Sequence, residues 1–94
     1  MSQAADSVRR RVVVHGSVQG VFFRDSTRRA AQSRGVAGWV ANRSDGGVEA
    51  VFEGAPDAVQ SMVEFARNGP RNAQVERVDV SEEEPEGLSD FSVR

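Results

Sequence analysis

Glycine and proline residues interrupt the sequence repeatedly, and five of these interruptions limit what the chain can fold into. Each segment between two interruptions is long enough for one helix or one strand and no more. The chain has 94 residues, which fit one compact domain. The fold must therefore be built from short elements that share a single core. The interruptions fall at Gly16–Gly20, Gly35, Asp45–Gly47, Gly54–Pro56 and Asn68–Pro70.

The first half of the sequence predicts a strand, a helix and a hairpin. Val8 to His15 is rich in valine and is expected to form a strand. From about Phe22 to Arg34, small and apolar residues recur at helical spacing, which predicts a helix. Two further strands, Val36 to Arg43 and Val48 to Glu53, are expected on either side of Ser44–Gly47. The Asp-Gly pair in that turn suits a tight hairpin.

The second half predicts a helix followed by two strands. Pro56 suits the first position of a helix that runs to about Arg67. Gln74 to Ser81 is expected to be a strand with a bulge, because its inward valines are unevenly spaced. Phe91 to Arg94 is expected to be a short strand at an edge. This order of elements predicts an α+β, ferredoxin-like split βαβ sandwich, with two helices on one face of an antiparallel sheet.

Two groups of acidic residues are expected to meet solvent. Glu49 and Glu53 alternate with apolar residues in the third strand, so both should point away from the core. Glu82–Glu84 and Glu86 have the composition of a solvated loop.

The ends of the chain and its composition limit the sites, the location and the partners that we expect of the protein. We expect residues 1–7 to form a flexible N-terminal tail and residues 8–94 to form the domain. The chain has no cysteine, which excludes disulfides, zinc sites with thiolate ligands and cysteine nucleophiles. No apolar run is long enough for a signal peptide or a membrane span, so we expect a cytoplasmic monomer with no membrane partner. The net charge of −2 argues against a nucleic-acid partner.

A glycine-bracketed loop between the first strand and the first helix is a candidate anion site. Glycines let the backbone curl so that consecutive N–H groups converge ahead of a helix N-terminus. Arg24, in the first helical turn, could turn its guanidinium over the same point and bind a phosphate through two hydrogen bonds. The pattern alone leaves open a plain strand-to-helix turn. The candidate loop residues are Gly16, Ser17, Val18, Gln19, Gly20 and Val21.

Asn42 is a second candidate site residue, near the end of the second expected strand. Asparagine is unfavourable in strands, and its amide can hold a water through one donor and one acceptor. An asparagine that only stabilises the hairpin is the alternative. Strand alternation points Trp39 away from Asn42, so Trp39 is expected to pack. His15, the only histidine, has no obvious carboxylate partner and is not expected to be catalytic.

Two stretches resemble the signatures of the acylphosphatase family, roughly G-x-V-Q-G-V-x-F-R and G-W-V-x-N-x-x-D-G-x-V-E. They run from Gly16 to Arg24 and from Gly38 to Glu49. The resemblance implies hydrolysis of the carboxyl–phosphate bond of an acyl phosphate, giving a carboxylate and inorganic phosphate, with no cofactor and no metal. In the family the loop amides and the arginine bind the phosphate, and the asparagine orients the attacking water. Arg24 and Asn42 match these two residues, and Gly16 to Val21 match the loop.

The resemblance leaves some points open. Ser17 stands where many members carry a basic residue, and Arg71 where a second proline is common. A non-catalytic phosphate-binding module on the same fold is the alternative function, and it would need Arg24 but not Asn42. An RNA-binding sheet would need stacking aromatics on its central strands and a basic face, which this sequence does not offer.

Overall fold

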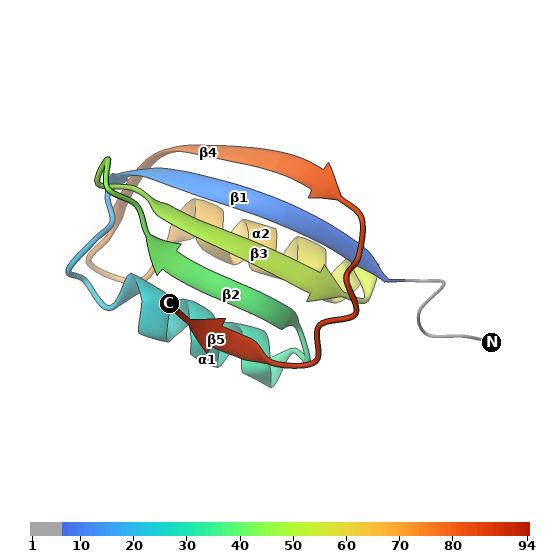
Figure 1. Cartoon of the computed structure of the whole chain (residues 1–94). Helices are drawn as coiled ribbons and strands as arrows, with labels where there is room; N and C mark the ends of the chain where they lie inside the picture. Colours follow the sequence, from blue (N-terminus) through green and yellow to red (C-terminus); the bar gives the residue numbers. More distant parts are fainter. Residues whose placement is uncertain (1–6) are drawn as a thin grey trace.

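The computed structural model describes residues 7–94, which form two helices and five strands (Figure 1). Most of the expected N-terminal tail, residues 1–6, lies outside the described residues. The elements begin and end within a few residues of the bounds expected from the sequence. They are β1 (Val8–Ser17), α1 (Phe23–Ser33), β2 (Ala37–Asn42), β3 (Val48–Gly54), α2 (Pro56–Asn68), β4 (Gln74–Glu83) and β5 (Phe91–Val93).

The strands form one sheet in the order β4-β1-β3-β2-β5, and both helices cover the same face of it (Figure 1). The first four strands pair antiparallel, as the ferredoxin-like prediction requires. β5 pairs parallel with β2, so the complete sheet is mixed and not wholly antiparallel as expected. The long connection after β4 makes this possible, because it brings the chain across the sheet before β5 begins.

The core lies between the sheet and the two helices. Phe52 of β3 is fully buried and stacks on Phe91 of β5, with 5.9 Å between ring centroids. This contact ties the last strand to the core. The face of α2 that packs on the core carries four residues that are almost fully buried: Val59, Met62, Val63 and Ala66.

A bulge between β1 and β4 confirms the irregularity expected from the spacing of valines. The register shifts between His15, which faces Arg77, and Gly16, which faces Val75. Gly16 has φ +133°, and a Cβ there would lie 2.1 Å from the backbone oxygen of Gln74. Only glycine fits such a close approach. The bulge lets β1 continue to Ser17, two residues past its expected end at His15.

Arginine and glutamate side chains cover the face of the sheet that the helices leave open. Arg9 is 4% exposed and contacts Glu53 at 3.2 Å, Glu83 at 2.9 Å and Glu86 at 3.4 Å. The expectation that Glu53 meets solvent was therefore wrong. The solvated acidic loop was right for Glu84 and Glu86, which are exposed and follow β4, but wrong for Glu83, which belongs to β4 and also pairs with Arg11. Strand alternation correctly predicted the face of the sheet on which Glu53 lies, but it did not predict that an arginine side chain covers Glu53.

Glu53 also fixes the connection between β4 and β5. Its carboxylate accepts the backbone N–H groups of Glu86, Gly87 and Leu88 at 2.7–3.0 Å. Burial raises the pKa of Glu53, but these N–H donors and the Arg9 guanidinium outweigh it, so the pKa lies below its usual value. The charged form of Glu53 therefore stabilises the fold at neutral pH.

We expect Glu53→Gln to lower the free energy of unfolding at pH 7 by about 3 kcal/mol, because it removes the most buried of the three carboxylates that pair with Arg9. A lowered folded-state pKa means that the contribution is complete above the unfolded value of about 4.3 and is lost as the pH falls through the folded value. Urea unfolding at pH 7 and pH 3 should show the gap to the wild type shrinking in acid. The control is Glu64→Gln on α2, whose side chain is 57% exposed. Equal stability of the two variants would contradict this account of Glu53.

Candidate active site

Residues 18–22 connect β1 to α1 and form a loop directly ahead of the helix N-terminus. Val18 is fully buried and anchors the loop in the core, whereas Gly20 is exposed and has φ +76°. The backbone N–H groups of residues 18–22 donate to no oxygen atom of residues 7–94. Together with the free N–H groups of the first helical turn, they can serve an anion.

The Gln19 side chain ties this loop to the β2–β3 hairpin. Its Nε2 donates to the backbone oxygens of Arg43 and Gly47, both at 2.7 Å. Arg43 directly follows Asn42, so Gln19 links the loop to the strand end that carries Asn42. Sequence reasoning counted Gln19 only among the phosphate ligands. It could not detect a contact between residues 24 and 28 positions apart.

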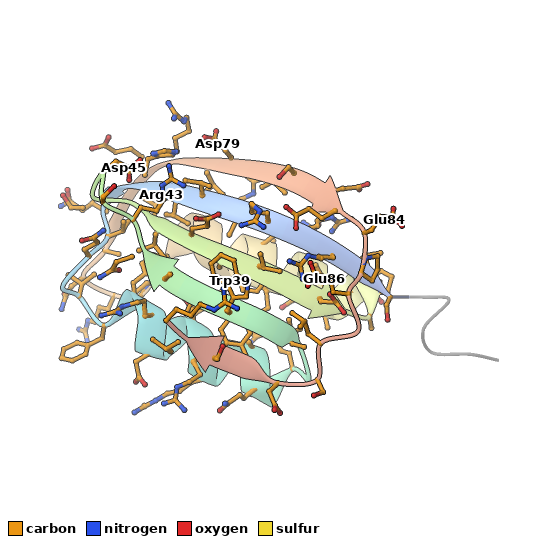
Figure 2. The ribbon with its side chains drawn as sticks, viewed as in Figure 1. Trp39, Arg43, Asp45, Asp79, Glu84 and Glu86 are labelled. Atoms are coloured by element: carbon orange, nitrogen blue, oxygen red, sulfur yellow. The ribbon has the colours of Figure 1, made fainter. Side chains whose placement is uncertain are left out.

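Arg24 lies in the first turn of α1, and its guanidinium contacts a residue that is 70 positions away in the sequence. Its Nη1 donates to the backbone oxygen of Arg94 at 3.0 Å. The Arg94 backbone N–H in turn donates to Val40 of β2 at 2.8 Å. The Arg94 guanidinium lies 4.4 Å from the centre of the Trp39 ring, on the open face of the sheet (Figure 2). Trp39 therefore packs as expected, and it supports the residue that contacts Arg24.

Asn42 is the last residue of β2 and is exposed. Its side-chain amide makes no hydrogen bond within the described part of the chain, so both its donor and its acceptor remain available. The hairpin that follows is held by other groups: Arg43 N–H donates to Gly47 at 2.8 Å, and Gly47 N–H donates to the Asp45 carboxylate at 3.0 Å. The hairpin contacts therefore do not use the Asn42 side chain.

A pocket of about 480 Å³ brings Arg24 and Asn42 together with part of the loop. Of the six predicted loop residues, Val18 and Gly20 line it. Gly16 and Ser17 belong to β1, so the loop proper begins two residues later than expected. The residues that line the pocket are Val18, Gly20, Phe22, Phe23, Arg24, Asp25, Arg28, Asn42 and Val93.

The charges on the pocket wall are unevenly balanced. Asp25 pairs with Arg28 at 2.7 Å and with Arg29 at 3.0 Å. The hydrogen bond from Arg28 holds the pKa of Asp25 below its usual value, so Asp25 is charged at neutral pH. By contrast, no side-chain carboxylate of residues 7–94 pairs with Arg24. Arg24 is thus a cation on this wall that no aspartate or glutamate side chain of residues 7–94 balances.

Phe22 is a pocket residue that sequence reasoning missed. It precedes α1 with φ 59° and ψ 26°, and it is the one residue other than glycine with positive φ in the described part of the chain. Such a conformation costs a bulky residue about 1–3 kcal/mol. The sequence gives no sign of it, because an aromatic residue before a helix reads as part of the helix.

His15 lies outside the pocket wall, on the part of β1 that faces β4. The expectation that it lacks a carboxylate partner was wrong, since its Nε2 is 3.0 Å from Asp79 of β4. Figure 2 shows Asp79 at the β4 edge of the sheet. Within residues 7–94, no group of three or more histidine, aspartate or glutamate side chains could hold a metal ion. Neither helix of that range is long and apolar enough to cross a membrane.

Comparisons with known proteins agree on one family. The family model described as Acylphosphatase matches residues 10–93. The chain is 57% identical to an acylphosphatase of Gloeobacter violaceus, over 95% of this chain and 96% of the relative. It is also similar to two solved structures. An acylphosphatase from Coxiella burnetii has a TM-score of 0.94 and 39% identity, covering 100% of this chain and 99% of that one. One from Bacillus subtilis has a TM-score of 0.88 and 42% identity, covering 93% and 98%.

Proposed function

The chain belongs to the acylphosphatase family of acyl phosphate hydrolases, and we propose that the pocket ahead of α1 carries out this reaction. In the proposed mechanism, a water attacks the phosphorus atom in line with the departing carboxylate. The products are a carboxylate and inorganic phosphate. The observation that carries the proposal is that Arg24 of α1 and Asn42 of β2 line one pocket beside the loop.

The phosphate would be bound by backbone N–H groups of residues 18–22 and by the Arg24 guanidinium. Those N–H groups lack partners among residues 7–94, and the positive end of the α1 dipole adds to their attraction for an anion. Arg24 is already oriented by the Arg94 backbone oxygen, so little reorganisation is needed when phosphate binds. Gly16 and Ser17 would act by fixing where the loop leaves β1.

Asn42 would place the attacking water. Its amide offers one donor and one acceptor side to a water, and its position at the end of β2 is fixed by pairing with Val48. A water held in line with the scissile bond reacts as if it were present at very high local concentration. The Gln19 contacts keep the hairpin and the phosphate loop at a constant separation.

The leaving group explains why so few groups suffice. A carboxylic acid has a pKa of about 4, so the carboxylate leaves at neutral pH without a proton from a general acid. The transition state for phosphoryl transfer is loose, so activation of the water by a strong base matters little. What this chain must supply is stabilisation of charge on the phosphoryl oxygens and placement of the water.

We expect Arg24→Ala to reduce the kcat/KM for a simple acyl phosphate by an amount equal to about 3–4 kcal/mol of transition-state stabilisation. Arg24→Lys should recover only part of this loss, because an ammonium group lacks the planar fork of the guanidinium. Arg29→Ala is the matched control, since Arg29 lies on the same helix but off the pocket wall, with a side chain that is 75% exposed. Near-normal turnover by Arg24→Ala would contradict the assigned role.

Asn42→Ala should lower kcat while leaving inhibition by inorganic phosphate almost unchanged, because a water-positioning residue acts mainly in the transition state. Asn68→Ala, at the exposed end of α2, should change neither constant. Steady-state kinetics with phosphate as the inhibitor measures both. Equal weakening of phosphate binding would make Asn42 a ligand. Normal kcat would mean that Asn42 does not place the water, whereas phosphate binding without hydrolysis by the wild type would favour the non-catalytic phosphate-binding module.

A further inference from the structure

The Phe22 side chain is largely exposed, and a contribution to folding does not explain why an aromatic residue lies there. The side chain is 82% exposed, so it buries little apolar surface in the core. Its backbone has φ 59°, a conformation that bulky residues rarely adopt. A strained residue whose side chain points into solvent is more readily explained by a binding role than by packing.

The surroundings of Phe22 suggest what it binds. It lines the same pocket as Arg24 and Asn42, and so does Val93 of β5, which is 41% exposed. Two exposed apolar side chains, from segments far apart in the sequence, thus share one wall with the proposed phosphate site. The other exposed large apolar residues of the described chain, Val80 and Leu88, do not line this pocket.

The remaining charges on the wall disfavour a charged acyl group. Arg28 is paired with Asp25 at 2.7 Å, so much of its positive charge is balanced within the wall and it attracts a substrate carboxylate less than an unpaired guanidinium would. The Asp25 carboxylate, charged at neutral pH, would repel a second anionic group on the substrate. An uncharged apolar group meets neither obstacle.

The size of the pocket leaves room for such a group beside the phosphate. A volume of about 480 Å³ falls in the range of roughly 300–1,000 Å³ that is typical of sites for whole small molecules. A phosphate held by the loop and Arg24 fills only part of it. The rest of the pocket, whose lining includes Phe22 and Val93, has room for the acyl group.

We propose that Phe22, supported by Val93, forms an acyl subsite that selects substrates with an uncharged aromatic acyl group. The ring of such a group can pack against the Phe22 ring, an interaction with a preferred geometry that a small aliphatic acyl group cannot make. This inference rests on the proposed function, because it takes the phosphate to lie at the loop.

The test compares benzoyl phosphate with acetyl phosphate as substrates of the wild type, Phe22→Gly and Phe22→Asn. Glycine and asparagine both tolerate positive φ, so neither variant should be less stable than the wild type in urea unfolding. We expect the ratio of kcat/KM for benzoyl phosphate to that for acetyl phosphate to fall roughly three- to tenfold in both variants, the range for loss of one aromatic pair. Val80→Thr, an exposed change on β4 away from the pocket, should leave the ratio unchanged.

An unchanged ratio in both Phe22 variants would overturn the proposal. An equal loss for both substrates would also overturn it, because Phe22 would then act only on the geometry of the loop.

A binding measurement separates this proposal from the proposed function. By calorimetry, the wild type should bind phenylphosphonate more tightly than methylphosphonate, and the Phe22 variants should lose that preference. If the wild type hydrolysed neither substrate yet kept the Phe22-dependent preference, the subsite would stand and the proposed hydrolysis would fail. Equal affinity of the wild type for both phosphonates would overturn the subsite.

Discussion

The hydrogen bond from Arg24 to the backbone oxygen of Arg94 joins the first helix to the last strand at the mouth of the pocket. Its geometry depends on β5 lying parallel to β2, which places Arg94 beside the N-terminus of α1. Glu53 holds the connection that leads into β5, and Trp39 supports the Arg94 side chain. The ion-pair network on the open face of the sheet thus helps to orient a guanidinium on the other side of the molecule.

The same arrangement gathers positive charge that no aspartate or glutamate side chain of residues 7–94 balances at Arg24. Arg24 lies at the positive end of the α1 dipole, next to a run of backbone N–H groups that lack protein partners within residues 7–94. Placing an arginine there weakens the isolated fold, and a bound phosphate would remove that cost. In the proposed mechanism, these donors would need little reorganisation as charge develops in the transition state, because β1, Gln19 and Arg94 hold them.

The sequence predicted what local patterns determine. The helix that begins at Pro56, the Asp45-Gly46 hairpin and the bulge near Val75 all follow from local residue patterns, and the structure confirms them. Alternation also placed Glu53 on the correct face of its strand. It could not show that Arg9, 44 residues earlier, covers that face, because ion pairs between distant residues leave no periodic signal.

The sequence likewise predicted only some residues of the candidate site. Arg24 and Asn42 stood out through their motifs, and the fold brings them to one pocket. Phe22 and Val93 did not, because the first owes its exposure to a single backbone conformation and the second to the parallel pairing of β5. Both features arise only once the chain has assembled. A motif therefore identified the groups proposed for catalysis, whereas the shape around them required the structure.

The central claim is that water is directed at the phosphorus atom of an acyl phosphate. Hydrolysis in water enriched in oxygen-18, analysed by mass spectrometry after a single turnover, tests it most directly. Attack at phosphorus breaks the bond between phosphorus and the bridging oxygen, so the label should appear in the inorganic phosphate and not in the carboxylate. Label in the carboxylate would mean that water attacks the carbonyl carbon, and the proposed roles of Arg24 and Asn42 would then be wrong.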